Sequence, residues 1–269
     1  MSGRDPDESG GEPSEEETPM SQTQVRPAPT PARRRSRGWW LVPFAAVWLL
    51  ILSYMLSAYL PPEMRTSRIP VAGHPVHYWL LVAHIGTATI ATLTGFGQFW
   101  PWLRRTHPRV HRYVGRAYFF AGVFPSLVLA VPVALLSSFG FANMAGLLAL
   151  DAAWAVTAVA GLRAAVQGRY PDHRRWMIRN FAVTLASLAS RPWQLLMSVL
   201  VFGFADSPIY HGNTLAMIHD VASSSVWLAL AGNLVVVEIY LARRYPHRVA
   251  RAVPRVRREK APVLESVSR

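Results

Sequence analysis

Two short basic segments hold the residues of this chain that could take part in chemistry. His111-Arg-Tyr-Val-Gly-Arg116 and His173-Arg-Arg-Trp-Met-Ile-Arg179 each place a histidine and arginines at the start of a long apolar run. Histidine can bind a metal ion or a haem iron, and arginine can bind carboxylates or phosphates. The likeness of the two segments favours two equivalent helical hairpins in which His111 faces His173. The alternative is that both places only need basic anchors at a membrane surface.

Polar residues also lie within or beside the apolar runs, where they are costly unless they pair with one another. Seven of them are expected in the half of the protein nearest the arginine-rich connections, which the charge pattern described below places in the cytoplasm. We call them the inner polar cluster: Gln98, His111, Arg116, His173, Arg179, Asn233 and Glu238. Glu238 interrupts the apolar run Val-Val-Val-Glu-Ile-Tyr, so a salt bridge to Arg116 or Arg179 is expected. The cluster either locks helices and binds lipid phosphates, or holds a small molecule, lipid or ion.

A second group, the outer polar cluster, is expected nearer the opposite surface. At a rise of about 1.5 Å per residue, His84 and Arg191 reach similar depths on different helices, and Asp151 lies nearer the middle. Arg191 needs an acceptor at that depth, so Asp151 and His84 are expected to complete a hydrogen-bonded cluster with it. Pro192 follows Arg191 directly, which predicts a kink and a free carbonyl at this point.

Haem b is the most specific cofactor that these residues indicate. His111 and His173 share a depth, His84 lies deeper, and imidazoles on facing helices can hold haem iron. The neighbouring arginines could neutralise the haem propionates.

A metal ion or an enzyme site has weaker support. A metal would use His107 and His111 with His173 and either Asp172 or Glu238. Pro108 favours an extended residue before it, which places His107 outside the helix. The chain has no cysteine and no HExxH, GxSxG, Walker or dinucleotide motif, so a non-enzyme is favoured.

Six apolar segments are long enough to cross a membrane, which takes about 20 residues in a helix. Their approximate bounds are Trp39–Leu60, Tyr78–Phe99, Arg112–Leu136, Phe141–Val166, Trp176–Phe202 and Val221–Leu241. Tryptophan and tyrosine at their ends suit the headgroup region. The sequence therefore predicts an all-α, polytopic integral membrane protein, with six transmembrane helices in a bundle over residues 39–242. A soluble six-helix bundle is the alternative.

Arginines mark one side of this bundle. They precede the first segment, lie in the second-to-third and fourth-to-fifth connections, and follow the sixth segment, whereas the alternate loops hold only Arg65 and Arg68. Because cytoplasmic loops retain positive charge, both termini are expected in the cytoplasm, at the cytoplasmic (plasma) membrane, with anionic lipid headgroups as partners. The net charge of +13 does not indicate nucleic acid, because the arginines form no basic domain. Residues 1–38 are expected to be a disordered tail and residues 243–269 a basic tail, both cytoplasmic.

Five short motifs follow one another along the apolar part of the chain. They are His-Ile-Gly at residues 84–86, Gly-x-x-Gln-Phe at 95–99, the two histidine–arginine starts at 111 and 173, and Asn-Leu-x-x-x-Glu at 233–238. In these motifs the chain resembles a bacterial family of predicted membrane proteins, domain of unknown function 2306, over about Tyr78 to Leu241. The resemblance implies that the inner polar cluster acts together with His84 and Arg191, and it implies no reaction. A more distant resemblance to membrane cytochromes b implies haem.

These observations together predict a membrane protein that holds a small molecule, lipid or ion at the inner polar cluster. The first alternative is a haem b electron-transfer protein that uses His111, His173 and His84. The second is a structural or sensory module that signals through its tails.

Overall fold

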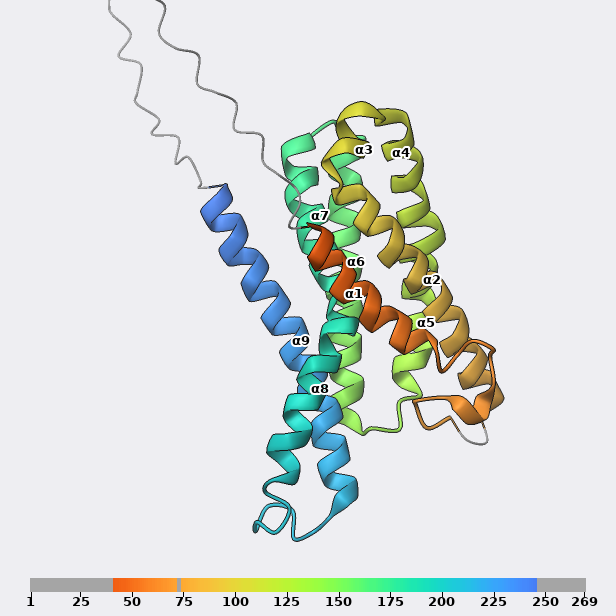
Figure 1. Cartoon of the computed structure of the whole chain (residues 1–269), viewed down its shortest axis with the longest axis vertical. Coiled ribbons are helices and arrows are strands. Elements are labelled where there is room, and N and C mark those ends of the chain that lie inside the picture. Colours follow the sequence, from red (N-terminus) through yellow and green to blue (C-terminus); the bar gives the residue numbers. More distant parts are fainter. Residues whose placement is uncertain (1–40, 72–73, 246–269) are drawn as a thin grey trace, which may run out of the picture. The chain divides into compact units, whose positions relative to one another are not determined.

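The computed structural model describes residues 41–71 and 74–245, and every regular element in these ranges is a helix (Figure 1). In chain order the helices are α1 (Leu41–Leu56), η2 (Met64–Thr66), α2 (Pro75–Phe99), α3 (Pro101–Thr106), α4 (Pro108–Ala117), η3 (Tyr118–Val123), α5 (Phe124–Leu135), α6 (Phe141–Val166), α7 (Tyr170–Thr184), α8 (Ala186–Phe202) and α9 (Thr214–Arg244). The all-α fold class is confirmed. The predicted N-terminal tail, and the predicted C-terminal tail beyond Tyr245, lie outside the described residues.

Four helical segments in the described ranges are long and apolar enough to cross a membrane, and a fifth is added if α7 and α8 form one bent span. The four are α2, the run from α4 through η3 to α5, α6, and α9. The first predicted segment corresponds to α1, a shorter apolar helix of 16 residues. The protein is therefore a membrane protein with several apolar helices, and a sixth span depends on α1.

The third predicted segment is helical throughout, but its hydrogen bonding changes in the middle. α4 begins at Pro108, the chain then widens into the π-helical η3, and α5 continues from Phe124. Pro125 has no N–H to donate to the preceding turn, and the wider π-helical turn accommodates its ring. His107 precedes α4 with a ψ of 63°, outside the helix as predicted.

The fifth predicted segment has a bend that the sequence did not predict. α7 and α8 meet at Leu185 with an angle of 43° between them, whereas Pro192 lies inside α8. The measured bend therefore lies before Pro192, and the kink expected at Pro192 itself stays a prediction. At the bend, the Ser187 hydroxyl donates to the Thr184 carbonyl at 3.2 Å, and hydroxyl bonds of this kind to the preceding turn bend helices.

Glycines bring neighbouring helices into close contact at the centre of the fold. A Cβ added at Gly122 of η3 would lie 2.8 Å from the backbone of Ala91 in α2, and one added at Gly95 would clash with the Phe181 ring of α7. Small residues at such crossings let membrane helices approach closely. Elsewhere α6 packs along α7, and α8 packs along α9 (Figure 1). These contacts hold together the helices that carry the basic segments.

Candidate functional site

The basic segments meet at one end of the helices. The short helix α3 lies at the same end as the start of α7 (Figure 1), and Arg104 of α3 interacts electrostatically with Arg174 of α7 and with Tyr245 after α9. The guanidinium carbons of Arg174 and Arg175 lie 5.6 and 5.4 Å from the centre of the Tyr245 ring. His111 of α4 lies within electrostatic reach of Arg104 and His173. We call this group the basic mouth: Arg104, Arg105, His111, His173, Arg174, Arg175 and Tyr245.

The cations of the basic mouth form no ion pair within the described residues. Asp172, the acid next to His173 in the chain, is bonded instead to Arg169, with 2.6 Å between Nη1 and Oδ2. Burial, and then the positive charges of Arg174 and Arg105, lower the pKa of Arg104 from its usual value. Grouped positive charges without a paired anion create a local potential that attracts anions.

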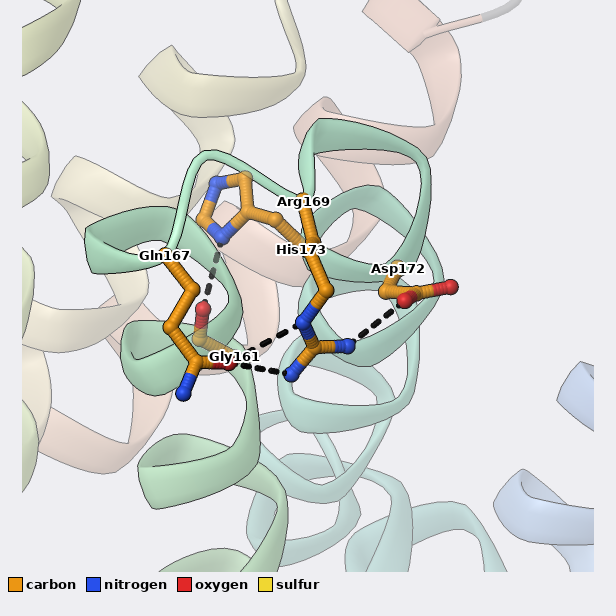
Figure 2. A network of polar contacts seen from close by, with 5 residues as sticks. All are labelled: Gly161, Gln167, Arg169, Asp172 and His173. Atoms are coloured by element: carbon orange, nitrogen blue, oxygen red, sulfur yellow. Dashed lines mark hydrogen bonds and ion pairs between the residues drawn. The ribbon is translucent and has the colours of Figure 1, made fainter.

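Two buried polar atoms at the mouth have no hydrogen-bond partner in the described part of the chain, Nδ1 of His111 and the hydroxyl of Tyr245. A buried polar group left unpaired costs about 1–3 kcal/mol. His173 differs, because its Nδ1 is bonded to the Gly161 carbonyl at 2.9 Å (Figure 2), which leaves Nε2 for another partner. A small anion with several acceptor oxygens would satisfy such donors and balance the charge.

The charged members of the inner polar cluster that lie outside the basic mouth contact other side chains of the protein. Arg179 and Glu238 form a bidentate ion pair with nitrogen–oxygen distances of 2.5 and 2.8 Å, which confirms the salt bridge predicted for Glu238. Arg116, the other partner considered, lies 5.5 Å from the Tyr113 ring centre instead.

The two amides of the inner polar cluster bind backbone carbonyls. Gln98 Nε2 donates to the His111 carbonyl at 3.1 Å, and Asn233 Nδ2 donates to the Ala182 carbonyl at 2.8 Å. These bonds tie α2 to α4 and α9 to α7. The cluster is thus divided, with helix-locking residues at depth and two histidines, His111 and His173, in the basic mouth.

The outer polar cluster is not hydrogen-bonded together, which corrects the prediction. His84 Nδ1 lies 3.1 Å from both the hydroxyl and the carbonyl oxygen of Ser126, and Arg191 Nη1 donates to Gln194 Oε1 at 2.9 Å. Oδ2 of Asp151 and Nε of Arg191 are buried without a partner among the described residues. Gln194 prevails as the partner of Arg191 because it lies one turn further along the same helix.

The described residues do not bring three His, Asp or Glu side chains together as a metal site. The proposed set of His107, His111 and His173 with an acid is therefore not assembled, since Asp172 is bonded to Arg169 and Glu238 to Arg179. His111 and His173 do lie near each other, as the two-hairpin prediction requires, and the repeat itself stays a prediction.

Asn180 of α7 is the centre of a buried network that the sequence did not indicate. It accepts from the Tyr118 hydroxyl at 2.5 Å and donates to the Trp154 carbonyl at 3.1 Å and the Thr157 hydroxyl at 2.9 Å. Thr184 accepts from the Trp154 indole at 2.8 Å. The network joins η3, α6 and α7. Its one signal in the sequence was an asparagine near the start of an apolar run, with no evident partner.

Residues 81–241 match the family described as predicted membrane protein, DUF2306. The chain belongs to this family. No curated protein and no solved structure matches it. The part of this DUF2306 protein that matches contains every cation of the basic mouth and ends before Tyr245. The family resemblance seen in the sequence is confirmed, and membership brings no reaction or ligand with it.

Proposed function

We propose that this DUF2306 protein is a six-span protein of the bacterial cytoplasmic membrane that binds a small anion from the cytoplasm at the basic mouth. Within residues 41–71 and 74–245, the observation that carries the proposal is a set of adjacent cations without an ion pair, beside two buried polar atoms without a hydrogen-bond partner. Grouped arginines, of which Arg104 is partly desolvated, and a free imidazole nitrogen bind phosphate or carboxylate oxygens well.

The distribution of arginines supports an orientation with both termini in the cytoplasm. The end that holds the basic mouth also carries Arg169 and, on α9, Arg243 and Arg244. At the other end, Arg65 pairs with Glu63 at 2.8 Å and Arg68 lies 4.1 Å from the Tyr54 ring centre. Positive charge therefore gathers on one side, which is the side retained in the cytoplasm.

Reporter insertions test this orientation. Alkaline phosphatase, which is active only outside the cytoplasm, should be active when inserted between α8 and α9, at Gly212. A fluorescent protein that folds in the cytoplasm should be fluorescent at Gly168, between α6 and α7. The reverse pattern of activities would refute the orientation.

Thermal unfolding of the purified full-length chain in uncharged detergent tests anion binding, with inorganic phosphate as the probe and chloride at equal ionic strength as the reference. At a phosphate concentration ten times the dissociation constant, binding should stabilise the protein by about 1.4 kcal/mol. Arg104→Gln should abolish this stabilisation. Because Arg104 is repelled by its neighbours, the same variant should melt higher than the parent without phosphate.

An exposed arginine of α4 provides the matched control. Arg109→Gln should leave the response to phosphate unchanged, because Arg109 is exposed and outside the mouth. Equal melting temperatures in phosphate and chloride, or an equal response in Arg104→Gln, would contradict the proposal.

Haem binding remains the second candidate, because His111 and His173 lie near each other. A visible absorption spectrum separates the candidates. A Soret band that disappears in His173→Ala would favour haem over the anion, and protein without that band would retain the anion proposal.

A further inference from the structure

An open groove of about 550 Å³ runs along α6, and none of its lining residues belongs to the basic mouth. Its apolar part includes Val156 and Val159, whose side chains are exposed. Its polar part is formed by Arg163, Gln167, Arg169 and Trp176. Since α6 is long and apolar enough to span a membrane, the valines face the hydrocarbon region and the polar residues face the headgroups.

The polar end of the groove is organised by Arg169. Its guanidinium donates to Gln167 Oε1 from Nε at 3.0 Å and from Nη2 at 2.7 Å, and to Asp172 Oδ2 from Nη1 at 2.6 Å (Figure 2). Asp172 therefore balances the charge of Arg169. With its oxygen held, Gln167 turns its amide nitrogen away from Arg169 (Figure 2), where it can donate to a ligand.

Arg163 supplies the unbalanced charge of the groove. It is exposed in the last turn of α6, and its side chain makes no hydrogen bond or ion pair within the described residues. The polar end therefore presents one positive charge beside one free amide donor, a set that suits a phosphate carrying a single negative charge.

The wall of the groove is held in place from the α9 side. The Arg179 guanidinium carbon lies 5.0 Å from the centre of the Trp176 ring, and Arg179 is itself fixed by its ion pair with Glu238. Tryptophan favours the headgroup region of a membrane. A wall held in this way loses little freedom when a ligand binds against it.

We propose that this groove binds an anionic phospholipid, with the phosphate on Arg163 and Gln167 and an acyl chain along Val156 and Val159. The volume lies within the range of about 300–1,000 Å³ that is usual for ligand sites. The single charge of Arg163 matches the single charge of a phosphodiester. The proposal requires only that α6 spans the membrane, and it does not depend on the basic mouth.

Native mass spectrometry of the full-length chain tests the groove. The probes are phosphatidylglycerol and phosphatidylcholine with identical acyl chains, added to protein in uncharged detergent. We expect preferential retention of phosphatidylglycerol, and about fivefold weaker retention in Arg163→Gln, as one lost charge near a membrane surface implies. Val159→Trp, which fills the apolar part, should also release the lipid. Arg112→Gln removes an exposed arginine of α4 outside the groove and should change nothing.

Three results would overturn the proposal. Equal retention of both lipids by the parent would show that the groove does not recognise the charge of the lipid. Equal retention of phosphatidylglycerol by Arg163→Gln and Arg112→Gln would show that the lipid does not bind at Arg163. Displacement of the lipid by millimolar inorganic phosphate would show that a free phosphate is the occupant. Arg104→Gln distinguishes this proposal from the basic mouth, because it should lose the phosphate response and keep the lipid.

Discussion

The buried amide of Asn180 makes a quantitative prediction about stability. Asn180→Ala removes three hydrogen bonds, those with Tyr118, the Trp154 carbonyl and Thr157. Side-chain hydrogen bonds between membrane helices are worth about 0.6 kcal/mol each, so the loss is about 2 kcal/mol. The Tyr118 hydroxyl stays within 3.1 Å of Thr184 Oγ1, so it is not stranded and adds no further large penalty.

The control is an asparagine that makes a single bond. Asn233→Ala removes its one hydrogen bond, to the Ala182 carbonyl, and should cost about 0.6 kcal/mol. Unfolding of the full-length chain in mixed micelles of increasing sodium dodecyl sulfate measures both. We expect Asn180→Ala to lower the folding equilibrium constant about 20-fold and Asn233→Ala about threefold. Equal losses in the two variants would refute the view that the stability contributed by the network grows with the number of its hydrogen bonds.

Two further predictions concern helix contacts and use the same unfolding assay. Glu238→Gln should cost less than about 1 kcal/mol, because the Glu238 side chain is half-exposed and its pair with Arg179 is partly screened. Exchanging the two residues, as Arg179→Glu with Glu238→Arg, should recover that loss, and no recovery would mean that the pair contributes nothing. Gly122→Ala should cost about 1–3 kcal/mol, because its Cβ would meet the Ala91 backbone. Gly86→Ala, with nothing within 4 Å, should cost nothing, and equal costs would contradict the close approach of η3 to α2.

The helical segments and their starts could be predicted from the sequence because their signals are local. Long apolar runs gave the positions of α2, α6 and α9, and Pro108 gave the start of α4. The partner of Glu238 was also within reach of sequence reasoning. A carboxylate in an apolar run must pair with a cation at similar depth, and Arg179 was one of two candidates.

Depth along a helix did not predict the outer polar cluster, because depth leaves the direction of a side chain undetermined. Successive residues differ by about 100° around a helix, so two side chains at one depth can face different neighbours. His84 faces Ser126 of α5, and Arg191 turns along α8 to Gln194. The bend at Leu185 was also missed, because the bond from the Ser187 hydroxyl to the Thr184 carbonyl depends on a side-chain direction that the sequence does not show.

The basic mouth was missed because its members look like anchors when they are considered singly. Arg104 and Arg174 belong to loops that the positive-inside rule already explains. Only the packing of α3, α7 and the end of α9 shows that they lie beside each other and beside Tyr245. Tyr245 lies at the far end of the last helix, so no local pattern connects it with His111 or His173.

Helix locking and ligand binding, which the sequence presented as alternatives for one cluster, belong to different layers of the protein. The deeper side chains, such as Arg179 and Asn233, satisfy one another or a backbone carbonyl, so a ligand there would have to displace existing bonds. At the end of the helices, His111 and Tyr245 keep buried polar atoms without partners among the described residues. Arg179 connects the deeper layer with the groove along α6. It is paired with Glu238 of α9 and also lies against Trp176 in the groove wall. A lipid bound against Trp176 would therefore lie next to the residue that joins α7 to α9.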